Sequence, residues 1–189
     1  MHLEGLDASP VRQERTTALH ILFVCTGNIC RSPTAERLAT AHAHETGLDG
    51  FSASSAGTRA ASGQPIHPEA ESVLVKLGGD PAEFAARHLT ERIAGSADLI
   101  LTMTTAHRAS VLEVAPQKLK RTFTLIEATR LVTEQNARTL ADLANFRPYL
   151  DGKNGLDIAD PIGQSPEVFA AVGKQIAAAL PPILELCRF

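Results

Sequence analysis

The sequence is poor in aromatic residues, in cysteine and in net charge, and each shortage excludes a class of protein. It holds seven Phe, one Tyr and no Trp in 189 residues, so binding of single-stranded nucleic acid by stacking on aromatic side chains is not expected. The net charge of −3 lacks the basic excess that nucleic-acid-binding domains usually carry. Three cysteines cannot build a disulfide framework, and none stands in a CxxC pair typical of metal sites.

Long hydrophobic runs are also missing. No stretch has the roughly 18 consecutive apolar residues that a membrane-spanning helix needs, and no apolar stretch of the signal-peptide kind follows the charged N-terminal residues. We therefore predict a cytoplasmic protein with reduced thiols, bound neither to a membrane nor to nucleic acid. The length fits one domain. We expect residues 1–18 to form a disordered tail and residues 19–189 to form the domain.

Short apolar segments rich in strand-forming residues alternate along the chain with segments of helical period. The first helix is expected to begin with Ser32 as N-cap and Pro33 at the first helical position. Strands are predicted at residues 20–24, 51–55, 97–103 and 121–126. Further helices are predicted at residues 68–77, 106–114, 139–146 and 166–187. This alternation indicates an α/β fold, a three-layer sandwich with a four-stranded parallel sheet and helices on both faces.

The segment between the first strand and the first helix, residues 25–32, has the sequence Cys-Thr-Gly-Asn-Ile-Cys-Arg-Ser. Ligands of open α/β sheets bind beyond the carboxyl ends of the strands. Backbone N–H groups and a helix start can surround an oxyanion there. Arg31 can hold its oxygens by parallel hydrogen bonds, and positive surroundings favour the thiolate of Cys25. The alternative is a structural cysteine beside a solvated arginine, but the Gly, Asn and Ser-Pro around the pair favour a phosphate site.

The string Val-Cys-Thr-Gly-Asn-Ile-Cys-Arg-Ser-Pro at residues 24–33 resembles the signature of the low-molecular-weight protein tyrosine phosphatases. The resemblance extends to residues 55–58, 86–90 and 157–161 and covers most of residues 20–187 in the right order. It implies sheet order 2-1-3-4 and hydrolysis of phosphomonoesters without a metal or an organic cofactor. The implied substrate is a phosphorylated protein or a small phosphate ester, and the implied product is inorganic phosphate.

The resemblance also implies roles for individual residues. Cys25 is the implied nucleophile, which forms a phosphocysteine, and Arg31 binds the phosphoryl oxygens in the transition state. Asp160 is the implied general acid and then general base. Ser55 would support the loop, and Ser32 would also donate a hydrogen bond to the leaving thiolate. The implied substrate-binding residues of the loop are Thr26, Gly27, Asn28, Ile29, Cys30 and Ser32.

Three positions bear on the choice of substrate. Where many family members carry two tyrosines after the Asp-Pro pair, this chain has Ile162 and Gly163, so the aromatic wall around an aryl substrate is thin. We assign Ile162 to substrate binding at this rim. Ile29 fits an aryl phosphate better than a phosphoarginine, because relatives that act on phosphoarginine carry a smaller polar residue there. Phosphotyrosine is the favoured substrate, with phosphoarginine and small esters left open.

Three alternatives stay open at this point. Cys30 can form a reversible disulfide with Cys25 that protects the nucleophile, or it can be a packed small residue. An arsenate reductase shares the loop but needs further thiols, and no cysteine lies between Arg31 and Leu186. A non-catalytic phosphate-sensing module would be marked by loss of the cysteine, the arginine or the acid, and all three are present. The histidines show no metal-ligand spacing.

Overall fold

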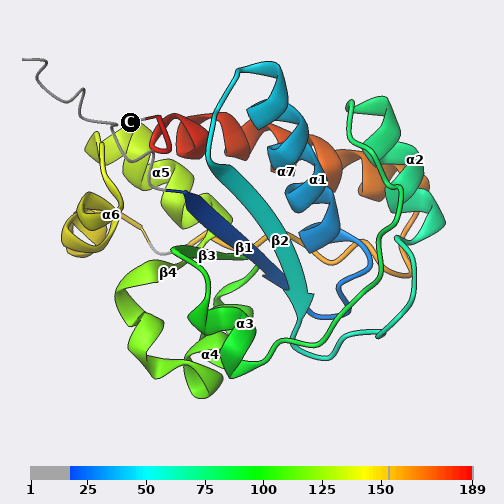
Figure 1. Ribbon diagram of the computed structural model, residues 1–189, viewed down its shortest axis with the longest axis horizontal. Coiled ribbons are helices and arrows are strands. Elements are labelled where there is room, and N and C mark those ends of the chain that lie inside the picture. Colours follow the sequence, from blue (N-terminus) through cyan, green and yellow to red (C-terminus); the bar gives the residue numbers. More distant parts are fainter. Residues whose placement is uncertain (1–17, 153, 189) are drawn as a thin grey trace, which may run out of the picture.

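The computed structural model describes residues 18–152 and 154–188, so all of the expected tail except Ala18 lies outside the described residues. Four parallel strands form one sheet of order β2-β1-β3-β4 (Figure 1). The strands are β1 (Leu19–Cys25), β2 (Phe51–Gly57), β3 (Leu99–Thr102) and β4 (Thr122–Thr124). The predicted α/β fold and its strand order are confirmed.

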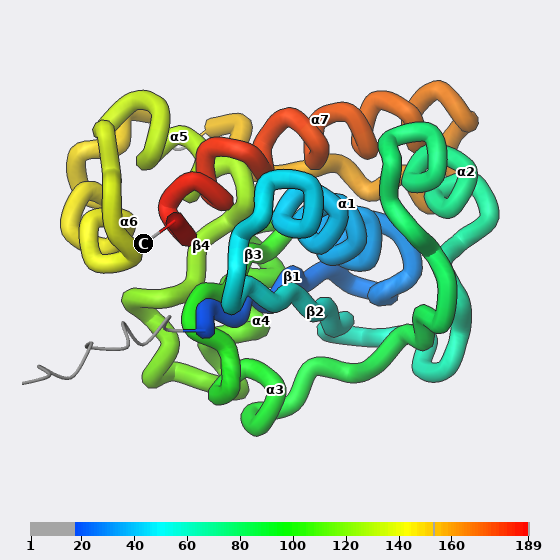
Figure 2. The backbone as a smooth tube through the Cα atoms, turned by 45° about the horizontal axis from the view of Figure 1, so that its top comes forward, coloured from blue at the N-terminus to red at the C-terminus, as the bar shows by residue number. Residues whose placement is uncertain are grey.

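Helices cover both faces of the sheet. Figure 2 shows α1, α2, α5 and α7 above it and α3 and α4 below it. The α-helices are α1 (Arg31–Glu45), α2 (Pro68–Lys76), α3 (Glu91–Gly95), α4 (Thr105–Val114), α5 (Leu125–Gln135), α6 (Leu140–Phe146) and α7 (Pro166–Glu185). Two 3₁₀ turns are η1 (Pro116–Arg121) and η2 (Arg147–Tyr149).

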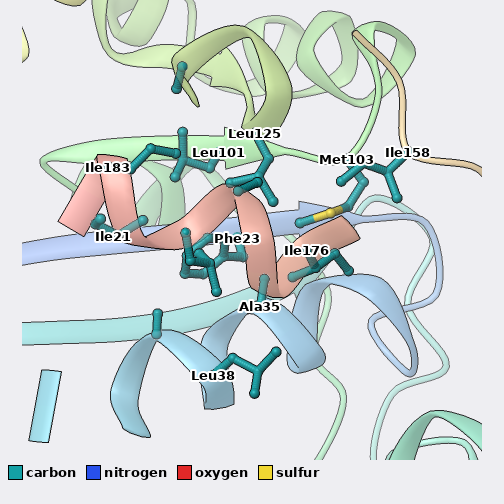
Figure 3. Packing of buried hydrophobic residues seen from close by; sticks show 14 of the residues in the cluster. Ile21, Phe23, Ala35, Leu38, Leu101, Met103, Leu125, Ile158, Ile176 and Ile183 are labelled. Carbon is teal, nitrogen blue, oxygen red and sulfur yellow. The ribbon is translucent and has the colours of Figure 1, made fainter. Parts of the chain in front are cut away.

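The central strand β1 is apolar on both sides because both sides are covered. Ile21 and Phe23 belong to the larger core cluster, which also contains Ile176 of α7 (Figure 3). Leu22 and Val24 belong to a smaller cluster on the face of α3 and α4. All five side chains are fully buried, each at a gain of about 1.5–3 kcal/mol. The strand is thereby fixed, and its carboxyl end presents Cys25 at the sheet edge.

Helix α7 has the length and hydropathy of a membrane-spanning segment, and no other helix in the described part of the chain has both. It packs against α1, α2 and α5. Its residues Phe169, Ile176 and Ile183 belong to the larger core cluster. The apolar composition of α7 is therefore accounted for by the core of the fold.

The start of α1 differs from the prediction. Cys30, rather than Ser32, is the N-cap residue, and its side chain makes no capping hydrogen bond. Ser32 lies inside the first turn and is fully buried. Its hydroxyl bonds the side chains of Cys25 and Asn28 instead. The prediction of Ser32 as N-cap was wrong because a tertiary contact uses the oxygen that the cap would need.

The fourth strand is shorter than predicted, and two helices were not predicted. β4 ends at Thr124, and α5 begins at Leu125, inside the range expected to be strand. Thr124 and Glu127 form a reciprocal capping box, which ends the strand and starts the helix. The short helix α3 begins after Thr90, whose hydroxyl accepts the Ile93 N–H.

Candidate active site

The loop between β1 and α1, residues 25–31, is called the catalytic loop below, and Asn28 determines its shape. Asn28 has a φ of 56°, a left-handed conformation that asparagine tolerates better than most residues. Its side chain is fully buried. The amide nitrogen donates to Ser32 Oγ at 2.9 Å and to Ser55 Oγ at 2.8 Å, and the oxygen accepts the Arg87 N–H at 2.9 Å. Asn28 therefore ties α1, β2 and the segment before α3 to the loop.

Cys25 lies at the end of β1 with its sulfur in contact with two polar groups. The Sγ atom is 3.0 Å from Ser32 Oγ and accepts the Asn28 N–H at 3.3 Å. The residue is buried. The Ser32 hydroxyl and the Asn28 N–H are therefore the groups placed to contact sulfur when it attacks or departs.

Arg31 begins α1 and connects the catalytic loop to residues far along the chain. Its side chain is 4% exposed. Nη1 donates to the Ile158 carbonyl at 2.9 Å, and Nη2 donates to Asp160 Oδ2 at 2.6 Å. The Nε atom is buried and has no hydrogen-bond partner in the part of the chain that the structure describes. A buried donor without a partner calls for an explanation, and an oxyanion in the loop supplies one.

The segment 156–163, called the acid loop below, brings Asp160 to the catalytic loop. The Ile158 N–H donates to the Met103 carbonyl at the end of β3 at 2.8 Å, and Ile158 is fully buried beside Met103 (Figure 3). Asp160 itself is 47% exposed. Its Oδ1 accepts the Ile162 N–H at 3.2 Å, so one carboxylate oxygen faces its own turn and the other faces Arg31.

Ser55 supports the catalytic loop from β2. Its hydroxyl accepts from Asn28 and donates to Glu36 Oε2 at 2.5 Å. Its carbonyl accepts from Arg87 Nε at 2.8 Å. Glu36 and Arg87 were not predicted from the sequence. Two features of the sequence could have pointed to them. Glu36 lies one helical turn after Ser32, and Arg87 lies in one of the segments that resemble the family.

His107 of α4 is a further residue of the site that was not predicted from the sequence. Its ring bonds Thr26 of the catalytic loop through Nε2 at 2.8 Å and Thr104 through Nδ1 at 2.9 Å. The residue is 7% exposed. Burial lowers the pKa of His107 from 6.5 to about 4, and the charge of Arg31 acts in the same direction. The imidazole is therefore neutral at physiological pH.

The other predicted residues of the loop lie around this frame. Cys30 is buried, and burial raises the pKa of its thiol to about 12, with the nearby charges of Cys25 and Asp160 adding to the effect. A Cβ on Gly27 would lie 3.4 Å from Ile29 Cγ1, so the Ile29 side chain lies over the loop. Ile162 is 45% exposed at the rim. The structure thus brings every predicted site residue to one end of the sheet.

The backbone of β2 lies directly behind the catalytic loop. Thr58 and Arg59 donate their N–H groups to the carbonyls of Cys25 and Thr26, both at 2.9 Å. A Cβ on Gly57 would lie 2.5 Å from the Thr26 carbonyl oxygen. Glycine is therefore required at the end of β2, because the loop approaches too closely for a side chain.

Comparisons with known proteins agree with this geometry. Residues 20–137 match the family model of low molecular weight phosphotyrosine protein phosphatase. The probable low molecular weight protein-tyrosine-phosphatase EpsP of Ralstonia solanacearum is 41% identical over 107 residues, which cover 57% of this chain and 70% of that protein. The protein-arginine-phosphatase of Geobacillus stearothermophilus is 31% identical over 165 residues, which cover 87% of this chain and 93% of that protein.

Among solved structures, the low molecular weight protein tyrosine phosphatase from T. tengcongensis has a TM-score of 0.71 and 32% sequence identity, and the match covers 88% of this chain and 98% of that one. The match therefore includes nearly the whole of the related fold. By its sequence and by its fold, this chain belongs to the low-molecular-weight phosphotyrosine protein phosphatase family.

Proposed function

We propose that the protein hydrolyses phosphomonoesters by forming a phosphocysteine on Cys25. The observation that carries the proposal is the pairing of two features in one loop. The Cys25 sulfur is held by two hydrogen bonds, and the buried Arg31 keeps an Nε–H that has no partner among the described residues. Family membership supports the same chemistry.

In the first step, the substrate phosphate sits in the catalytic loop with its oxygens on backbone N–H groups and on Arg31. Cys25 Sγ attacks phosphorus as the bond from phosphorus to the leaving oxygen breaks. Protonated Asp160 gives its proton to that oxygen, so that an alcohol or phenol departs rather than its anion. Positioned donors stabilise the charge that develops on the equatorial oxygens.

In the second step, water attacks the phosphocysteine and inorganic phosphate is released. The Asp160 carboxylate takes a proton from the water, which returns it to its starting form. Ser32, whose hydroxyl is 3.0 Å from the sulfur, donates to the departing thiolate. Asp160 lies beyond residues 20–137 of the family match, so its role rests on its contact with Arg31.

For the substrate, we favour phosphotyrosine on a protein. Relatives of this chain include proteins named tyrosine phosphatase and a protein named arginine phosphatase. The residues at the mouth, Ile29 and Ile162, are apolar, and an aromatic ring gains more from such a surface than a guanidinium does. The exposed position of Ile162 leaves room for a peptide to approach.

Cys30 is the proposed partner of an oxidised Cys25. A peroxide converts the Cys25 thiolate to a sulfenic acid, and the Cys30 thiol then displaces water to form a disulfide. The high pKa of Cys30 makes it a neutral thiol that does not compete for the substrate. We also propose a cytoplasmic location, since a chain with three cysteines has no disulfide framework of the kind that secreted proteins use.

The test is steady-state hydrolysis of p-nitrophenyl phosphate, a phosphotyrosine peptide and a phosphoarginine peptide, without added metal. We expect the wild type to turn over the phosphotyrosine peptide faster than the phosphoarginine peptide. We expect no turnover from Cys25→Ser. Cys187→Ser is the matched control, because that thiol is also buried but lies after α7. If the wild type instead reduces arsenate with added thiol, it is a reductase. If it only binds phosphate, it is a sensing module.

A further inference from the structure

The first turn of α4 contacts both loops of the candidate site. His107 bonds Thr26 of the catalytic loop at 2.8 Å. On the other side, Asp157 of the acid loop accepts the Thr105 N–H at 2.7 Å and lies 3.4 Å from the Thr105 hydroxyl. Thr104 caps the same turn by accepting the His107 N–H at 3.1 Å. Two loops that are more than 120 residues apart in sequence thus meet on one turn of helix.

We propose that this turn, residues 104–107, positions the two loops for catalysis: His107 orients the catalytic loop through Thr26, and Asp157 holds the acid loop so that Asp160 reaches the leaving group. The proposal rests on the proposed function. His107 and Asp157 act through other residues and touch no reacting atom, so they are positioning residues.

The hydrogen bonds of Thr104 select one tautomer of His107. Thr104 Oγ1 already accepts the backbone N–H of His107, so its hydroxyl proton is free to be donated to His107 Nδ1, 2.9 Å away. Nδ1 is then the acceptor, and Nε2 carries the ring proton. Nε2–H therefore donates to Thr26 Oγ1. In the other tautomer the backbone N–H and the ring Nδ1–H of His107 would both point at Thr104 Oγ1. The hydroxyl proton of Thr104 would then need a different acceptor.

The low pKa of His107 keeps this arrangement intact at physiological pH. A charged imidazolium would carry N–H donors on both nitrogens and would break the bond from the Thr104 hydroxyl. Burial and the charge of Arg31 oppose that form, as does Arg59, while Asp160 and Asp157 favour it. The neutral ring thus connects α4 to the catalytic loop by hydrogen bonds of fixed direction.

Asp157 holds the acid loop from the opposite side. Its carboxylate lies at the N-terminus of α4, where the helix dipole favours a negative charge. The next residue, Ile158, is bonded to Met103 through its N–H and to Arg31 through its carbonyl. The position of Asp160, two residues further on, is therefore set by anchors on α4, on β3 and on the catalytic loop.

The first arm of the test measures binding of inorganic phosphate by calorimetry to Thr26→Val, His107→Ala and the double variant. We expect each single change to weaken binding about threefold to tenfold, the range of one hydrogen bond. The double variant should be no weaker than the weaker single one, because both changes remove the same contact. His88→Ala is the control, since His88 lines the same pocket as Thr26 and His107. Independent, multiplying losses would overturn the role of His107.

The second arm measures kcat/KM, which reports on formation of the phosphocysteine alone, for aryl phosphates whose leaving groups differ in pKa. We expect Asp157→Ala to lose about tenfold or more on phenyl phosphate, which needs protonation, and little on p-nitrophenyl phosphate. Asp157→Asn keeps an acceptor for the Thr105 N–H and should restore the wild-type dependence. An equal loss on all substrates, or none, would overturn the role of Asp157.

Thr105→Pro removes the hydrogen bond between the Thr105 N–H and Asp157 by removing its donor. This variant replaces Asp157→Ala in the test if Asp157→Ala does not fold. Proline suits the first position of a helix, and the extended backbone of Thr104 is what a residue before proline requires. We expect this variant to show the same dependence on the leaving group as Asp157→Ala. Phosphate binding needs no turnover, so a wild type that hydrolyses nothing would refute the proposed function while the first arm still decides on His107.

Discussion

The catalytic loop and the acid loop meet at Arg31, but the molecule holds them in different ways. In the catalytic loop and the turn after it, Asn28 and Ser32 are fully buried and bonded to each other and to Cys25 or Ser55. In the acid loop, Ile158 is buried, whereas the side chain of Asp160 and the whole of Ile162 are almost half exposed. One loop is part of the core, and the other is a surface segment with one buried anchor.

This difference separates two tasks of a phosphatase. In the proposed mechanism the buried network recognises the phosphate, which is common to all substrates, and a change in one member leaves buried partners unsatisfied. In the same mechanism the exposed loop faces the leaving group, which differs between substrates, and a change there is expected to cost little stability. Substrate choice is therefore expected to vary through the acid loop and the rim while the catalytic loop stays constant.

The largest effect is expected from Arg31→Lys, which disrupts the point where the two loops meet. A lysine keeps the charge but not the planar fork that reaches the Ile158 carbonyl, Asp160 and an oxyanion together. We expect kcat/KM for p-nitrophenyl phosphate to fall ~10²- to 10³-fold. Arg37→Lys, six residues further along α1, is the control. A loss below tenfold at Arg31 would contradict the role given to its fork.

The second-largest effect is expected from Asp160→Ala, which removes the exposed carboxylate of the ion pair between Arg31 and Asp160. We expect kcat to fall about 10²-fold or more on phenyl phosphate. Phosphate binding should not weaken, because Arg31 no longer shares its Nη2 with a carboxylate. Asp151→Ala removes an exposed carboxylate earlier in the same connection and should change neither quantity. Weaker phosphate binding in Asp160→Ala would show that the two tasks are not separate.

A smaller effect is expected on stability from the buried imidazole behind the catalytic loop. Between pH 7 and pH 5 the unfolded chain protonates His107 near pH 6.5, whereas the folded chain does so only near pH 4. The unfolded state then binds more protons, so the free energy of unfolding falls as the pH falls, by about 2 kcal/mol from this residue. Urea unfolding at both pH values should show a smaller decrease for His107→Asn. Equal decreases in the two proteins would refute this.

The smallest effect is expected at the rim. Ile162→Tyr supplies an aromatic side chain where this chain has an exposed isoleucine. Contact between aromatic rings contributes about 0.5–1.5 kcal/mol, so KM for a phosphotyrosine peptide should fall about twofold to tenfold with kcat unchanged. Val75→Tyr, at another exposed apolar position, should change neither. An altered kcat in Ile162→Tyr would mean that the rim also positions Asp160.

The alternation of apolar and helical segments was enough to predict the parallel sheet, and the string at residues 24–33 was enough to predict the loop with Cys25 and Arg31. The strand order was predicted only through the resemblance to a known family. The roles of Glu36, Arg87 and His107 could not be predicted in the same way. Each acts through a contact between segments distant in sequence, and an isolated glutamate, arginine or histidine has no local signature. Ser32 shows the converse, because its local pattern predicted an N-cap and a tertiary bond replaced it.

The ion pair between Arg31 and Asp160 joins residues that are 129 positions apart. At a synthesis rate of about 5–20 residues per second, Asp160 leaves the ribosome roughly 6–26 s after Arg31. During that time the nascent chain already contains the proposed nucleophile and phosphate-binding arginine but not the acid or its anchor at Ile158. Because Arg31 is held by Ile158 and Asp160 and β1 shares its core cluster with α7, the site is complete only when nearly the whole chain has been synthesised.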